Sequence, residues 1–140
     1  MKKKLKTIAV QGFGFVGAVN SVNVAISNQL KNYQVLCFEN RNARTIKIFD
    51  KASKGEFPYN TNDKDLVNKF KKLVRDKKIR FTFNKNDYQK ASIVLVTINY
   101  DLKKVKMTKK AFLDSFKEII NNAQKNTLIV IAKKYLMLKI

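Results

Sequence analysis

Apolar runs alternate with amphipathic segments along most of the chain. Short apolar runs, typical of strands buried on both faces, occupy residues 4–11, 33–38, 79–83, 92–98 and 127–132. Apolar residues spaced three or four apart predict helices over residues 15–30, 44–53, 63–77 and 108–124. Strands that alternate with helices in this way predict an α/β fold with a parallel sheet.

Polar residues and glycine mark several expected boundaries. Gly55 is expected to end the helix over 44–53, Thr108 to cap the last helix, and Asn86 to cap a brief turn that runs to Ala91. Residues 133–140 fit no element and predict an irregular tail. Because 140 residues suit one compact unit, we expect residues 1–140 to form a single domain.

A glycine-rich turn joins the first strand to the first helix and matches the pattern G-x-G-x-x-G. In this context Gly12 permits the tight turn, Gly14 lets a pyrophosphate approach the backbone, and Gly17 lets the helix pack against the strand. The motif predicts a Rossmann-type doubly wound parallel sheet of about five strands. The expected cofactor-binding residues of the turn are Gly12, Phe13, Gly14, Phe15, Val16 (as a backbone donor) and Gly17.

Glu39 closes the second strand, where a carboxylate accepts hydrogen bonds from ribose hydroxyls and repels a 2′-phosphate. NAD is therefore the expected cofactor. NADP is the alternative cofactor, because an arginine near Glu39 in sequence, Arg41 or Arg44, accommodates a 2′-phosphate. A plain surface role is the alternative for both arginines, and an ordinary strand-to-helix turn is the alternative for the glycines.

The chain has 30 basic and 10 acidic residues, a net charge of +20. A nucleic-acid-binding protein is one interpretation of that charge. Lysine and asparagine share A/T-rich codons, however, and the lysines are spread along the chain, so we expect biased composition and no nucleic-acid partner. No apolar stretch is long enough for a membrane span. We expect no membrane partner.

Few residues here suit catalysis or metal binding. The chain contains no histidine, which excludes histidine-based catalysis, and we expect no metal site. The single cysteine, Cys37, lies within an apolar strand and is expected to be buried and inert. One cysteine and no signal peptide predict a cytoplasmic location.

The turn and several other segments resemble the UDP-glucose/GDP-mannose dehydrogenase family. Residues 8–17 resemble that family's opening strand and G-x-G-[YF]-V-G turn, and Glu39 stands where the family usually has aspartate. Arg44 matches its basic position. Further similarity lies at residues 54–59 (K-G-x-x-P), 80–82 (R-F-T) and 91–99. The resemblance covers about residues 4–132.

The resemblance implies an NAD-binding domain of an enzyme that oxidises a UDP- or GDP-sugar alcohol to a carboxylate. It implies that Arg44 flanks the adenosine and that Thr97 and Asn99 line the nicotinamide end. The family's catalytic cysteine and lysine lie in a C-terminal sugar-binding domain that is absent here, so no residue is assigned as catalytic. We expect this chain to be inactive alone, to meet a nucleotide sugar only with that domain, and to form a homodimer only within a full-length enzyme.

The chain also departs from the family pattern. Tyr100 and Asp101 replace a Thr-Pro pair, and residues 133–135 replace a turn that contains proline. Its ending at Ile140 predicts a truncated, frameshifted or split gene product. A non-catalytic dinucleotide-binding module or a gene remnant is the alternative function.

Overall fold

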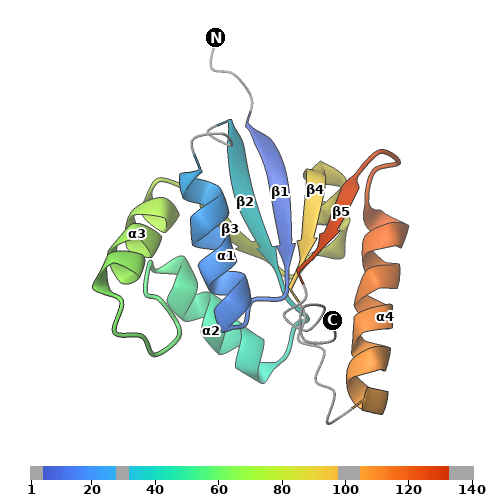
Figure 1. The fold of residues 1–140 in the computed structure, drawn as a ribbon, viewed down its shortest axis with the longest axis horizontal. Helices are drawn as coiled ribbons and strands as arrows, with labels where there is room; N and C mark the ends of the chain where they lie inside the picture. The colour runs from blue at the N-terminus through green and yellow to red at the C-terminus, as the bar shows by residue number, and fades with distance from the viewer. Residues whose placement is uncertain (1–4, 28–31, 98–104, 133–140) are drawn as a thin grey trace, which may run out of the picture.

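Every strand of the sheet runs parallel to its neighbours. The structure, a computed structural model, describes residues 5–27, 32–97 and 105–132. Its elements are β1 (Lys6–Gln11), α1 (Phe15–Ile26), β2 (Tyr33–Phe38), α2 (Ala43–Ser53), α3 (Lys64–Arg75), β3 (Ile79–Thr82), η2 (Lys85–Lys90), β4 (Ala91–Val96), α4 (Val105–Asn122) and β5 (Leu128–Ile131). The strand order is β3-β2-β1-β4-β5 (Figure 1). This is the predicted Rossmann-type doubly wound α/β fold.

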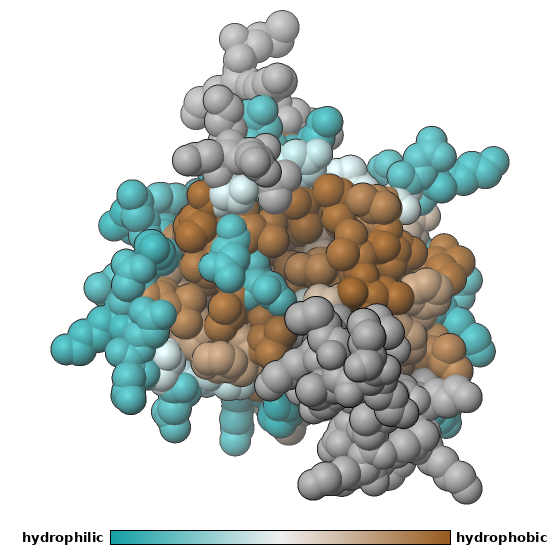
Figure 2. Space-filling model, viewed as in Figure 1, coloured by the Kyte–Doolittle hydropathy of each residue, from teal (hydrophilic) through white to brown (hydrophobic). Residues whose placement is uncertain are grey.

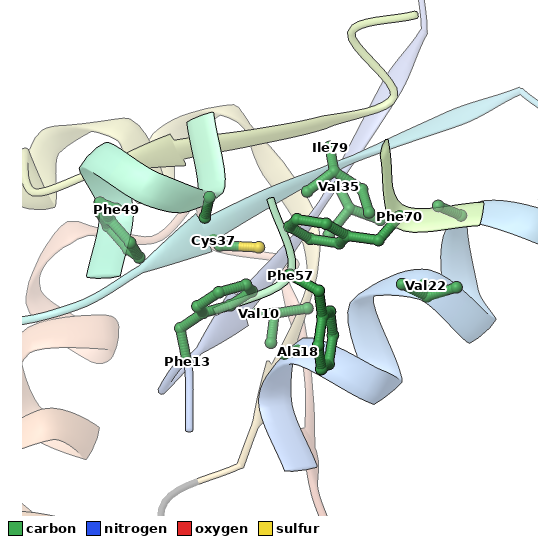
Figure 3. Close-up of a cluster of buried hydrophobic side chains, with 12 residues drawn as sticks. Val10, Phe13, Ala18, Val22, Val35, Cys37, Phe49, Phe57, Phe70 and Ile79 are labelled. Atoms are coloured by element: carbon green, nitrogen blue, oxygen red, sulfur yellow. The ribbon is translucent and has the colours of Figure 1, made fainter. Parts of the chain in front are cut away.

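Two apolar cores lie on opposite faces of the sheet. Because side chains alternate along a strand, Val10 of β1 packs with α1, α2 and α3, whereas Ala9 packs with α4 and η2. Phe13, Phe49 and Phe70 fill the first core (Figure 3). Burial on both faces explains why the centre of β1, residues 8–10, is a continuous apolar run.

The strand order reverses at β1, which lies between β2 and β4. The register pairs Gln11 at the end of β1 with Phe38 of β2 on one side and Val96 of β4 on the other. The segments that follow these three residues therefore meet at one edge of the sheet. Open α/β sheets bind ligands at this point, outside the carboxyl ends of the strands.

The predicted strands and helices are confirmed, most with ends one or two residues from those predicted. Corrections are needed at the end of one helix and at two predicted caps. Helix α1 ends at Ile26 rather than at residue 30, and residues 28–31 lie outside the described part of the chain. The brief turn begins earlier than predicted. Its N-cap is Asn84, whose side chain accepts the Asn86 N–H, so Asn86 lies inside the turn. Thr108 is not the cap of α4, since the helix already begins at Val105. The predicted tail, residues 133–140, lies outside the described residues.

The surface toward the viewer in Figure 2 is apolar over its centre, with hydrophilic side chains along its left edge and at its upper right. Exposed apolar residues include Phe15 and Val16 at the start of α1, and Leu128 and Val130 on β5. None of the described helices is both long and apolar enough to cross a membrane.

Candidate functional site

The glycine turn leaves β1 sharply and leads directly into α1. Gly12 has a φ of +92°, which disfavours residues with a side chain, and its N–H donates to the Phe38 carbonyl at 3.0 Å. A Cβ on Gly17 would lie 2.0 Å from the Gly12 carbonyl oxygen and 2.9 Å from Thr97 Oγ1. Gly17 is therefore required for the close packing of α1 on the turn.

Gly14 differs from Gly17, because a Cβ there would meet no atom within 4 Å. Gly14 is the N-cap of α1, with φ −76° and ψ −169°, and no side chain caps the helix. The first helical hydrogen bond runs from the Ala18 N–H to the Gly14 carbonyl. The N–H groups of the first helical turn thus have no intrahelical acceptor and suit an anion such as a phosphate.

Glu39 follows β2 directly and reaches back to the glycine turn. Its Oε1 accepts the Phe13 N–H at 2.7 Å, and its Oε2 accepts the Asn40 N–H at 3.3 Å. Because a carboxylate has about four lone-pair positions, acceptor capacity remains for ribose hydroxyls. Glu39 is therefore attached to the turn and also suited to a ribose.

Thr97 lies against the glycine turn. Its hydroxyl is 2.7 Å from the Gly12 carbonyl and 3.0 Å from that of Gln11, and the side chain is buried. Because a hydroxyl has one proton, these carbonyls compete for it. The structure thus gives Thr97 a role in holding the turn, while its contact with a cofactor stays a prediction. Asn99 lies outside the described residues.

The two phenylalanines of the turn have different environments. Phe13 is 1% exposed, and its ring meets that of Phe49 edge-on at 5.8 Å (Figure 3). It also meets the Phe81 ring edge-on at 5.3 Å. Phe15 is 46% exposed, and its ring contacts Phe57 and Tyr59 at 6.2 Å. The Phe13 ring therefore anchors the turn in the core, while the Phe15 ring lies at the surface beside it.

The two arginines after β2, Arg41 and Arg44, have different surroundings. Arg41 stacks its guanidinium over the Phe83 ring at 5.5 Å, which gives it a packing role. Arg44 lies exposed in the first turn of α2, near enough to Tyr59 for its charge to lower the pKa of that hydroxyl against a larger rise from burial. Arg44 is thus an exposed cation close to Tyr59.

Tyr59 is a site residue that sequence reasoning missed. Its hydroxyl donates a hydrogen bond to the Phe13 carbonyl, 46 residues earlier in the chain. The available signal was its place at the end of the K-G-x-x-P segment, which the resemblance includes. No local pattern predicts that this segment reaches the glycine turn.

Cys37 faces the core, not the site. Burial raises the pKa of its thiol from 9.0 to about 12, and its Sγ lies 3.3 Å from the hydroxyl oxygen of Ser21. Because the thiolate is the nucleophile, this cysteine is unsuited to covalent catalysis. Among the described residues, no three or more histidine, cysteine or acidic side chains gather where they could hold a metal ion.

We expect Cys37 to react with an aromatic disulfide reagent at pH 8 about a hundredfold more slowly in the folded chain than in urea. The pKa of the Cys37 thiol is higher in the folded chain than in the unfolded chain. Only the unfolded chain therefore loses this proton between about pH 9 and pH 12, so the free energy of unfolding is unaffected below about pH 9 and falls as the pH rises toward 12. Stopped-flow absorbance measures the reaction. Equal rates in the two states would contradict the buried position.

A hollow of about 630 Å³ lies at the opposite end of the sheet. Leu5, Thr7 and Gln34 line it from the amino ends of β1 and β2. Because ligands of open α/β sheets bind at the carboxyl ends, we assign the site to the glycine turn rather than to this hollow.

Comparison with known proteins supports the fold. No family model and no curated protein matches the chain. Among solved structures, it resembles an NDP-N-acetyl-D-galactosaminuronic acid dehydrogenase from Methanosarcina mazei Go1, with a TM-score of 0.77 and 19% identity over 92% of this chain and 27% of that one. It also resembles a GDP-mannose dehydrogenase from Pseudomonas aeruginosa, with a TM-score of 0.70 and 14% identity over 90% and 28%.

A lactate dehydrogenase from Eimeria maxima, solved with NADH and oxamate, has a TM-score of 0.61 and 16% identity over 96% of this chain and 38% of that one. The chain thus spans between about a quarter and two-fifths of the length of these three proteins. At these identities the likeness establishes the Rossmann-type fold that nucleotide-sugar dehydrogenases also have.

Proposed function

We propose that this chain binds NAD at the glycine turn and is the dinucleotide-binding part of a nucleotide-sugar dehydrogenase. The observation that carries the proposal is the open space at Gly14, in front of an uncapped helix N-terminus and next to Glu39. A pyrophosphate needs that space and those N–H groups, and a ribose needs that carboxylate. The residues present therefore fit the cofactor.

Each residue has a separate part in binding. The backbone N–H groups at the start of α1, including that of Val16, donate to the pyrophosphate, and Gly14 leaves room for it. Glu39 accepts from the adenosine ribose, and exposed Arg44 flanks the adenosine. Thr97 and Gly17 hold the turn against α1. When bound, NAD supplies the hydride acceptor for oxidation of an alcohol.

We also propose that the substrate of the complete enzyme is a nucleotide sugar. This proposal rests on the sequence resemblance, and two of the solved neighbours are named as dehydrogenases of nucleotide sugars. We expect the chain alone to bind NAD without reducing it when UDP- or GDP-sugars are added, because buried Cys37 cannot serve as the nucleophile. NADH absorbance measures turnover, and reduction by this chain alone would contradict the expectation.

Replacing Glu39 with glutamine tests the preference for NAD over NADP. Glutamine keeps an oxygen for the Phe13 N–H but removes the charge that repels a 2′-phosphate. We expect the NAD-to-NADP affinity ratio to fall by about tenfold or more, the scale of one charged hydrogen bond. Calorimetric dissociation constants for both cofactors on both proteins measure the ratio.

Asp50→Asn is the matched control, because it removes a carboxylate that is 70% exposed on α2 and pairs only with Lys54 among the described residues. It should leave the ratio unchanged. A Glu39→Gln variant with an unaltered ratio would show that Glu39 serves the turn and not the ribose.

A further inference from the structure

One peptide segment of the glycine turn is held from two sides by residues distant in sequence. Glu39 Oε1 accepts the Phe13 N–H, and the Tyr59 hydroxyl donates to the Phe13 carbonyl. The Phe13 ring is buried in the first core. The backbone polar groups and the side chain of Phe13 are thus fixed by the residue that follows β2, by the loop after α2 and by the core.

The bond from Tyr59 also fixes an N–H group. A peptide unit is planar and trans, so its carbonyl and its N–H point in opposite directions. The Phe13 carbonyl shares a peptide unit with the Gly14 N–H. Holding the carbonyl toward Tyr59 therefore directs the Gly14 N–H away from Tyr59.

This peptide unit needs such a restraint. Gly14 has no Cβ, and Gly12 two residues earlier has a φ of +92°, so the backbone on both sides of Phe13 has more freedom than usual. Rotation of the unit would exchange the position of a positive N–H for that of a negative carbonyl oxygen. Next to a pyrophosphate this exchange replaces attraction with repulsion.

Tyr59 is well placed to remain a donor. Burial raises the pKa of its hydroxyl, the nearby charge of Arg44 opposes that rise, and Glu39 adds to it. The hydroxyl is therefore protonated at neutral pH. Its ring is held edge-on by Phe15 and Phe57, each at 6.2 Å.

We propose that Tyr59 is a positioning residue of the dinucleotide site, whose hydroxyl holds the Phe13 carbonyl away from the pyrophosphate. This inference rests on the proposed function. It predicts that Tyr59 matters for ligands that carry the pyrophosphate and not for the adenosine part alone.

The test is Tyr59→Phe, which keeps the ring and removes only the hydroxyl. Tyr33→Phe is the control, because Tyr33 begins β2 at the opposite end of the sheet. Calorimetry measures NAD binding, and nuclear magnetic resonance titration measures adenosine binding. We expect Tyr59→Phe to weaken NAD binding by about tenfold, the scale of one hydrogen bond, and adenosine binding by less than about twofold, with neither changed in Tyr33→Phe.

A second measurement needs no ligand. The Gly14 amide resonance of isotope-labelled protein is expected to shift or broaden in Tyr59→Phe and not in Tyr33→Phe. Unaltered NAD affinity in Tyr59→Phe, or equal losses for NAD and adenosine, would overturn the role of Tyr59 while leaving NAD binding intact. Failure of the unaltered folded chain to bind NAD would instead overturn the proposed function, and this inference with it.

Discussion

Replacing Gly17 with alanine is expected to destabilise the chain by about 3 kcal/mol or more, at the upper end of overpacking effects. The new Cβ would lie 2.0 Å from the Gly12 carbonyl oxygen, an obstacle that no rotamer change can relieve because the backbone alone fixes the positions of both atoms. Helix α1 would have to move away from β1. Urea unfolding followed by circular dichroism measures the loss.

Gly14→Ala is the control for this prediction. It introduces the same methyl group three residues earlier, where no atom lies within 4 Å and the backbone is extended. We expect its stability to remain within about 0.5 kcal/mol of the unaltered chain. Equal stabilities of Gly17→Ala and Gly14→Ala would contradict the close packing of α1 on the turn.

Replacing Gly14 with valine is expected to weaken NAD binding by about a hundredfold or more, the scale of several lost hydrogen bonds. The larger side chain would fill the space that the pyrophosphate needs, since its Cβ would project where no protein atom lies within 4 Å. Thermal unfolding with and without NAD measures the effect. The unaltered chain should gain about 2.7 kcal/mol at a hundred times its dissociation constant, and the variant almost none.

Asn23→Val is the matched control, since it places valine on the exposed face of α1, away from the turn. It should retain the stabilisation by NAD. A Gly14→Val variant that is stabilised by NAD as strongly as Asn23→Val would mean that the cofactor does not bind over Gly14.

Local patterns predicted most of the elements because those patterns arise from burial. The apolar run over residues 33–38 gave the bounds of β2 correctly, since both faces of that strand are covered. The end of α1 was predicted too far along the chain. Asn20, Asn23 and Asn28 blur its apolar stripe, and no glycine or proline marks the true end at Ile26.

The candidate site was also predicted only in part. The spacing of Gly12, Gly14 and Gly17 indicated a turn, because a positive φ and close packing each require glycine. The hydrogen bonds that Phe13 makes with Glu39 and Tyr59 could not be predicted. They depend on how β2 and the loop after α2 approach the turn, which only tertiary packing determines.

The most direct test of the account is calorimetric titration of the unaltered chain with NAD at moderate and at high salt. Binding through directed N–H groups and a ribose carboxylate predicts saturable, one-to-one binding that persists at high salt. A role that depends on the net charge of +20 would instead give affinity for nucleic acid that falls steeply with salt. Absence of NAD binding by a chain that circular dichroism shows to be folded would contradict the account.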